Sequence, residues 1–276
     1  MRVSLAEALG TCFGVDDAIE MAMDPAFGGN LTILGQLVHN PQVVQKLQEN
    51  GVRIVESLDQ VNTPNVMVTA HGTAQSIKDA IRARGLNIFD ASCPLVMRVH
   101  KQIAEFERDG CHICVLGKLT HVEVRGLVGD LDDYTVVETE EDIPKLEGRD
   151  KIGIVCQTTQ QTSVAEAIVL KIKETFPTAE VRFVNTICKP TKDRQQAVES
   201  LADRVDLMIV IGGRNSSNTA KLKKVCDEKG VEAHHIERVE EINPAWFVGK
   251  QHVGVTAGTS TPPWVIDEVY RKIKDM

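Results

Sequence analysis

The sequence predicts an α/β fold built from three repeated units, each with a small parallel sheet. Apolar runs that end in glycine or small polar residues alternate with amphipathic helical runs. The apolar runs are LTILG, VMVTA, HICVLG, KIGIVC, LMIVIGG and HVGVTAG. In addition, Cys12, Cys93 and Cys188 each open a helical run, and they lie 81 and 95 residues apart. Similar contexts at similar intervals indicate a repeat.

Each predicted unit contains the same features in the same order. After the cysteine, a glycine follows at 23 or 24 residues, and a polar side chain follows four residues later; the pairs are Gly35 and His39, Gly117 and His121, and Gly212 and Ser216. A second strand then ends in a polar turn: TAHGT around His71, CQTTQ around Thr158, and TAGTS around Ser260. We expect units at residues 12–94, 95–186 and 187–276, the last with the N-terminal strand 1–11.

The three cysteines are expected at helix N-termini. In GTCFGVDDAIEMAM, apolar residues recur at helical spacing after Cys12. Pro94 and Pro190, just after Cys93 and Cys188, suit a helical first turn. Backbone N–H groups and the helix dipole favour a thiolate at such a position. The pattern therefore favours reactive or metal-binding thiols over packing residues, although buried cysteines at helix starts remain an alternative.

Three inward-pointing cysteines would meet near a pseudo-threefold axis. Three thiolates can hold three irons of a 4Fe-4S cubane and leave the fourth iron without a protein ligand, whereas electron-transfer clusters normally use four cysteines. Zinc bound by three thiolates and a histidine is the rival metal site, but structural zinc motifs usually place their ligands in close pairs. An iron with an open position would be a catalytic site.

The other four cysteines lie in sequence contexts that are typical of packing residues. Cys111 and Cys114 form a CHIC pair that superficially matches a zinc or redox motif, but the pair lies at the start of an apolar strand. Cys156 ends a strand beside QTT, and Cys226 falls in a helical run. We interpret all four as packing residues, with a metal or redox role for CHIC as the alternative.

The remaining loop residues present hydrogen-bond donors where helices are expected to start. They are His39, His71, Ser216, Ser217, Asn218 and Ser260. Helix N-termini with such side chains bind anions, and this set of donors suits a diphosphate. Ordinary helix capping would also explain Ser217, Asn218 or Ser260 taken singly.

Composition excludes several classes of protein. The formal net charge of −8 argues against a general nucleic-acid binder. No apolar run approaches the roughly 18 residues needed to span a bilayer, and seven cysteines, an odd number, argue against a disulfide framework. We therefore expect a cytoplasmic protein that associates with neither membrane nor nucleic acid.

Nearly the whole chain resembles the 4-hydroxy-3-methylbut-2-enyl diphosphate reductase (LytB) family. The resemblance is carried by GTCFGV, LGQLVHNP, TAHGT, DASCPLV, HVEVRG, CQTTQ, NTICKPTKDRQ, NSSNT and TAGTSTP. It implies a trefoil of three α/β domains around a central iron-sulfur cluster. It also implies reductive removal of the C4 hydroxyl of (E)-4-hydroxy-3-methylbut-2-enyl diphosphate, which gives isopentenyl and dimethylallyl diphosphates in the last step of the methylerythritol phosphate pathway.

The resemblance also implies a role for each matching residue. By this match, the 4Fe-4S cluster, with one iron lacking a protein ligand, is held by Cys12, Cys93 and Cys188. The diphosphate cradle consists of His39, His71, Ser216, Asn218 and Ser260, with His121 and Ser217 in or beside it. Glu123, Thr158 and Thr159 face the hydroxyl end of the substrate, and reduced ferredoxin or flavodoxin supplies electrons. Thr11 and Ser92 depart from the Phe and Thr expected before the first two cysteines, which affects packing rather than ligation.

Hydroxide is a poor leaving group, so this reaction needs a Lewis acid, a proton donor and two electrons. Glu123 lies two residues from His121, and we expect it to act as the acid with Thr158 relaying or orienting the proton. One rival function is a metal-dependent phosphohydrolase that uses His39, His71, His121 and Glu123, but it leaves the three cysteines idle. The other is a non-catalytic iron-sulfur sensor, which leaves the anion site idle.

Overall fold

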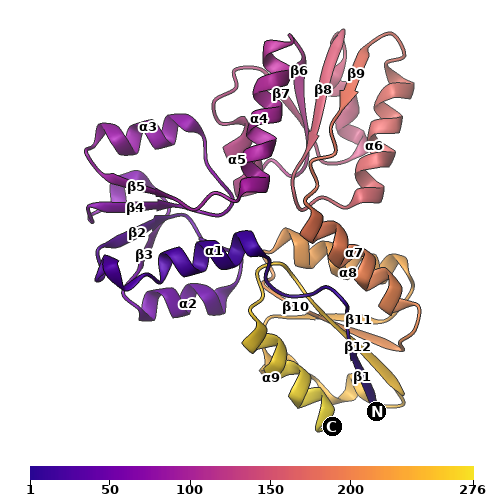
Figure 1. Ribbon diagram of the computed structural model, residues 1–276. Coiled ribbons are helices and arrows are strands. Elements are labelled where there is room, and N and C mark those ends of the chain that lie inside the picture. The colour runs from indigo at the N-terminus through magenta and orange to yellow at the C-terminus, as the bar shows by residue number, and fades with distance from the viewer. The chain divides into compact units, whose positions relative to one another are not determined.

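The computed structural model describes residues 1–276 and contains three four-stranded sheets whose strands are all parallel (Figure 1). One sheet has the order β3 (Arg53–Val55), β2 (Leu31–Leu34), β4 (Asn65–Val68) and β5 (Asn87–Asp90). The second has the order β7 (Tyr134–Val137), β6 (His112–Leu116), β8 (Lys151–Cys156) and β9 (Glu180–Phe183). The third has the order β1 (Arg2–Leu5), β12 (His252–Ala257), β10 (Leu207–Ile211) and β11 (Ala233–Ile236). The predicted α/β class with small parallel sheets is confirmed.

The chain divides into two compact units. The first unit contains residues 1–16, 38–46 and 189–276 and holds the β1-β12-β10-β11 sheet. The second contains residues 17–37 and 47–188 and holds the other two sheets. Helices α1 (Phe13–Ala22) and α2 (Pro41–Glu49) carry the chain from one unit to the other. The division into three domains and their trefoil arrangement stay predictions.

The sheet of the first unit is covered on both faces, as parallel sheets require. Alternate residues of β10 point to opposite faces. Leu207, Ile209 and Ile211 pack in one apolar cluster with α9 (Pro263–Lys274), and Met208 and Val210 pack in another with α7 (Lys189–Ala202) and α8 (Ser217–Glu228). The strand is therefore apolar throughout its length.

The second unit repeats this layering around β6 and β8. Helix α6 (Thr162–Thr175) covers one face of their sheet, and α4 (Pro94–Arg108) with α5 (Val122–Val128) covers the other. A smaller cluster of Val66, Val68 and Ile81 joins β4 to α3 (Gln75–Ala83). None of the helices is both long enough and apolar enough to cross a membrane.

The CHIC pair belongs to this packing. Residues three apart on an extended chain face opposite sides, and Cys111 packs in the α4 and α5 cluster whereas Cys114 packs in the α6 cluster. Burial raises the pKa of both thiols. Cys226 is buried too, and burial raises its pKa to about 12. Raised pKa values make these thiols poor nucleophiles and poor metal ligands. Because Cys111 and Cys114 lie on opposite faces of the sheet, the alternative of a paired CHIC metal site is contradicted.

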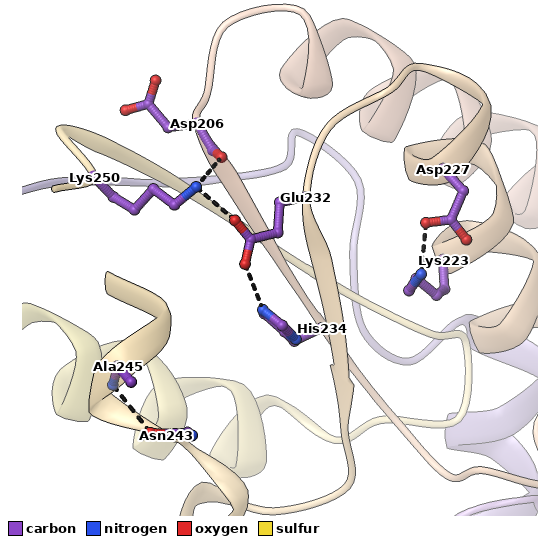
Figure 2. A network of polar contacts seen from close by, with 8 residues as sticks. All are labelled: Asp206, Lys223, Asp227, Glu232, His234, Asn243, Ala245 and Lys250. Atoms are coloured by element: carbon purple, nitrogen blue, oxygen red, sulfur yellow. Dashed lines mark hydrogen bonds and ion pairs between the residues drawn. The ribbon is translucent and has the colours of Figure 1, made fainter. Parts of the chain in front are cut away.

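A polar network fastens the amino ends of the strands in the first unit (Figure 2). Lys250, just before β12, donates to a carboxylate oxygen of Glu232 at 2.6 Å and to the carbonyl oxygen of Asp206 at 3.3 Å. Glu232 in turn contacts His234 at the start of β11. The Asp206 carboxylate accepts hydrogen bonds from the backbone N–H groups of Gln251 and His252, both at 2.8 Å. Polar contacts within the protein occupy the amino ends of these strands. A ligand is therefore expected at their carboxyl ends, as in other parallel sheets.

We expect Asp206→Asn to lower the melting temperature slightly, by no more than about 2 °C, at pH 7 without changing ligand binding. Hydrogen bonds from the N–H groups of His252 and Gln251 hold the pKa of Asp206 below its ordinary value. Such a carboxylate stabilises the fold above its unfolded pKa of about 4, and the contribution is lost as pH falls through the folded pKa. Melting curves recorded from pH 7 downward should therefore converge for the two proteins. A constant difference across that range would contradict the charge-based explanation.

Candidate functional site

The three predicted ligand cysteines all stand at helix starts. The carbonyl oxygen of Cys12 accepts hydrogen bonds from the N–H groups of Val15 and Asp16 at the start of α1, and Cys93 occupies the N-cap of α4. Cys188 directly precedes α7. These three side chains are half-buried, whereas the other four cysteines are buried, and none of the seven forms a disulfide. Their partial exposure at helix starts distinguishes these three thiols from the four that serve as packing residues.

Cys93 and Cys188 belong to the second unit, and Cys12 belongs to the first. In the second unit, the N–H of Cys93 donates to Ala70 and the N–H of Cys188 donates to Thr158, both at 3.0 Å. Each cysteine is thereby tied to a predicted polar turn, TAHGT or CQTTQ. No three His, Cys, Asp or Glu side chains form a metal-binding group in the structure. Joint ligation by the three cysteines therefore stays a prediction.

The second unit brings His71, His121, Glu123 and Thr158 together. The rings of His71 and His121 meet edge to face with centroids 5.7 Å apart. The N–H of Glu123 donates to Nδ1 of His121 at 3.2 Å, so His121 caps α5. A nitrogen that accepts a hydrogen bond carries no proton, and the neutral ring therefore keeps its proton on Nε2. His121 can donate that proton to a ligand.

Glu123 and Thr158 are joined by two hydrogen bonds. The carboxylate is 1% exposed and accepts two hydrogen bonds from Thr158, from its N–H at 2.6 Å and from its Oγ1 at 2.7 Å. Two donors from one residue fix the plane of the carboxylate. Thr159, the next residue, accepts a hydrogen bond from Nε2 of Gln157 at 2.7 Å. Glu123 is therefore an oriented, water-shielded group that can hold or release a proton.

The first unit brings His39, Ser216, Asn218 and Ser260 together from three distant segments. Ser216 is the N-cap of α8, and Ser217 and Asn218 form the first turn of that helix. Ser260 Oγ donates to the carbonyl oxygen of His39 at 3.2 Å. A Cβ atom on Gly213 would lie 2.3 Å from that same oxygen, so only glycine fits there. Burial lowers the pKa of His39, so its ring is neutral at pH 7.

Asn218 buries a polar side chain that no protein group satisfies. It is 2% exposed, and neither its amide nitrogen nor its amide oxygen has a hydrogen-bond partner. Burying an unsatisfied amide costs about 1–3 kcal/mol. Helix capping does not account for it, because capping would supply a partner. Thr219 and Thr256 also bury hydroxyls without partners. Both lie in motifs that the sequence analysis quoted, NSSNT and TAGTS, but neither residue was assigned a role there.

Two further residues missed from the sequence hold the site in place. Arg194 is 7% exposed, and its guanidinium donates to the carbonyl oxygens of Gly10 and Thr11 at 2.6–2.9 Å, which fastens the segment before Cys12 to α7. Glu237 accepts a hydrogen bond from the N–H of Arg214 at 2.7 Å, and its carbonyl oxygen accepts one from Gln42 at 2.8 Å. Glu237 thereby joins Arg214, just before the NSSNT motif, to Gln42 of α2. Such contacts between distant segments leave no local signal in the sequence.

Comparison with known proteins gives one consistent result. The family model described as LytB protein matches residues 3–274. The 4-hydroxy-3-methylbut-2-enyl diphosphate reductase of Geobacter metallireducens is 42% identical, with 100% of this chain and 98% of the relative covered. The same-named protein of Aquifex aeolicus is 37% identical, with 99% of this chain and 96% of the relative covered.

Solved structures agree with these sequence matches. The E-1-hydroxy-2-methyl-but-2-enyl-4-diphosphate reductase of Plasmodium falciparum is similar with a TM-score of 0.93 at 29% identity, over 98% of this chain and 87% of that one. A structure of (E)-4-hydroxy-3-methyl-but-2-enyl diphosphate reductase, described as the terminal enzyme of the non-mevalonate pathway, gives 0.72 at 37% identity over 100% of both chains.

We expect Asn218→Ala to weaken the binding of inorganic diphosphate by about tenfold while lowering the melting temperature by no more than about 2 °C. The substitution removes an amide that has no protein partner, so the folded state loses no hydrogen bond. Calorimetric titration and thermal melting measure the two effects. Thr261→Val is the matched control, because Thr261 Oγ1 already donates to the carbonyl oxygen of Ile211 at 3.0 Å. Unchanged diphosphate affinity in the Asn218 variant would contradict the cradle.

Proposed function

The chain belongs to the LytB family, and from this premise we propose that it is a 4-hydroxy-3-methylbut-2-enyl diphosphate reductase that removes the C4 hydroxyl of the allylic diphosphate. The full-length matches to reductases of that name support the activity. The observation in the structure that carries it is the pair formed by Glu123 and Thr158, because this reaction needs a shielded proton donor. The products are isopentenyl and dimethylallyl diphosphates.

We propose Cys12, Cys93 and Cys188 as the ligands of a 4Fe-4S cluster that leaves one iron without a protein ligand. Their half-buried thiols at helix N-termini fit thiolate ligation, and the four buried cysteines do not. When bound, such a cluster supplies the electrons and a Lewis acid for the hydroxyl. Arg194 keeps the Cys12 segment in place from the protein side.

The diphosphate is held by neutral donors. In the first unit, Ser216, Ser217 and Asn218 present the N-terminus of α8, and His39 and Ser260 lie beside one another. His71 and His121 contribute ring N–H groups from the second unit. Binding energy gained at the diphosphate orients the reacting hydroxyl at the other end of the substrate.

Glu123 supplies the proton at the hydroxyl end. Thr158 Oγ1 fixes the carboxylate and offers a path for the proton, and Thr159 lies beside it in the same turn. His121 completes the group, because the N–H of Glu123 itself holds the ring in place. A buried acid held by two donors does not exchange its proton freely with water, so protonation is directed to the substrate.

A reductive reaction needs an electron donor, for which we propose reduced ferredoxin or flavodoxin, and we expect a cytoplasmic location. The phosphohydrolase alternative is not favoured, because it gives the three helix-start cysteines no role. The sensor alternative is not favoured either, because the unsatisfied amide of Asn218 calls for a ligand. Iron and sulfide content separates the hydrolase from the reductase, and turnover of the allylic diphosphate separates the reductase from the sensor.

Replacing Cys12, Cys93 or Cys188 with serine should abolish turnover and reduce bound iron and sulfide by at least about half. A hydroxyl is a poor substitute for a thiolate ligand of iron. Cys111→Ser is the control and should keep its iron and sulfide, because Cys111 packs among apolar residues. Elemental analysis of protein purified without oxygen measures both. The assignment is wrong if the Cys188 variant keeps a full cluster while the Cys111 variant loses it.

Glu123→Gln should lower turnover of the allylic diphosphate by about 100-fold or more while the cluster and substrate binding are retained. Glutamine keeps the size of the side chain and an oxygen that can accept from Thr158, but it cannot deliver a proton. Steady-state kinetics with dithionite-reduced dye, together with iron analysis, measure the effect. Near-normal turnover with a full complement of iron would show that another group, such as His121, donates the proton.

A further inference from the structure

Helix α4 begins directly after Cys93 and exposes positive charge along one face. Met97, Arg98 and Lys101 are exposed, and the Met97 side chain is 40% exposed. These residues lie three and four positions apart, so they share one face of the helix. Val99 and Ile103 are buried on the opposite face. We call Met97, Arg98 and Lys101 the α4 basic face.

The charges of this face are not neutralised by the protein. Neither Arg98 nor Lys101 forms an ion pair, whereas Lys189 and Lys223 each pair with a carboxylate four residues along their own helices. The α4 sequence contains no Asp or Glu before Glu105. Two unpaired cations with an exposed thioether beside them are unexpected on a chain whose net charge is −8.

The α4 basic face lies at the cysteine end of its helix. Arg98 is five residues from Cys93, which corresponds to about 7–8 Å along a helix axis, and Lys101 is about 12 Å from it. At the far end of α4, the N–H of Cys111 donates to Phe106, and β6 then begins. Arg98 and Lys101 thus lie toward the end of α4 that is near the carboxyl ends of the strands. The site residues of this unit follow the same ends of the strands.

The other two helices that start at a predicted ligand cysteine are charged differently. Helix α1 exposes Asp16, Asp17 and Glu20. In α7, Lys189 is paired with Asp193 at 2.8 Å, and Arg194 is buried against backbone carbonyls. Only α4 offers two exposed, unpaired cations and no carboxylate in its first two turns. An acidic protein would be attracted to α4 and repelled by α1.

We propose that the α4 basic face is the docking surface for an acidic electron-carrier protein. This inference rests on the proposed function, because only a reductive reaction needs such a partner. Each encounter oxidises the reduced carrier by one electron, so two encounters supply the two electrons that the reaction needs. The C–O bond breaks, one proton leaves with the hydroxyl as water, and a second proton forms the C–H bond of the product. Arg98 and Lys101 steer the carrier, and Met97 provides an apolar centre for a small, short-lived contact.

The test compares two double variants of the holoenzyme purified without oxygen, Arg98→Glu/Lys101→Glu and the milder Arg98→Gln/Lys101→Gln. Flavodoxin, an acidic carrier, is the probe. We expect the charge reversal to raise the Kd for oxidised flavodoxin and the KM for reduced flavodoxin, each by about tenfold. The glutamine variant should raise the same two constants by about threefold. The dependence of Kd on salt should weaken in both, since fewer charges then face the carrier. Turnover with reduced methyl viologen, a small dye, should stay within about twofold.

Arg271→Glu/Lys272→Glu on α9 is the matched control, with the same charge change on an exposed helix that starts at no cysteine. It should bind flavodoxin nearly as the unmodified protein does. The proposal is overturned if flavodoxin binding is unchanged in both α4 variants, or if the α9 variant weakens binding equally. Loss of dye-driven turnover in both α4 variants would also overturn it, by assigning these residues to the site itself. If the unmodified protein fails to turn over the allylic diphosphate but still binds flavodoxin through α4, the proposed function fails and the docking surface stands.

Discussion

The site depends on one property of parallel α/β structure, the position of helix N-termini at the carboxyl ends of strands. An N-terminus presents unpaired N–H groups and the positive end of the helix dipole. In this protein Cys12, Cys93 and Cys188 stand at the starts of α1, α4 and α7, and His121 and Ser216 cap α5 and α8. The same backbone feature thus favours two kinds of negative charge, the thiolates and the proposed diphosphate.

The polar groups of the site fall into two classes with different energetic consequences. Glu123 and Thr158 satisfy one another, so their geometry is fixed before any ligand binds. Asn218, Thr219 and Thr256 bury polar atoms that the protein leaves without partners, and each lowers the stability of the free protein. A bound diphosphate would recover part of that free energy. In the proposed reaction, the reacting end would therefore be preorganised, whereas the anchoring end would gain its hydrogen bonds on binding.

The fold class and part of the candidate site could be predicted from the sequence, because the signals for them are local. The strand-like runs and the helix-start cysteines gave the α/β class and singled out the three accessible thiols among seven. The contact of Arg194 with Gly10 spans 184 residues, and no local pattern reports such a pairing. For the same reason the contact of Glu237 with Gln42 was missed. The division into three domains stays a prediction, because a repeat in the sequence specifies sheets and not which sheets belong to one compact unit.

Charge is used in two separate ways in this acidic chain. The proposed anion site relies on neutral donors, and burial keeps His39 neutral by lowering its pKa. Neutral donors avoid the cost of burying a cation that stays charged when the site is empty. The unpaired cations Arg98 and Lys101 lie instead on the exposed face of α4. There they stay hydrated, so they carry no desolvation penalty, and they can attract an approaching acidic protein over about a Debye length. If both proposals hold, short-range hydrogen bonds select the small anion and long-range charge selects the protein partner, so the two affinities can be tuned by different residues.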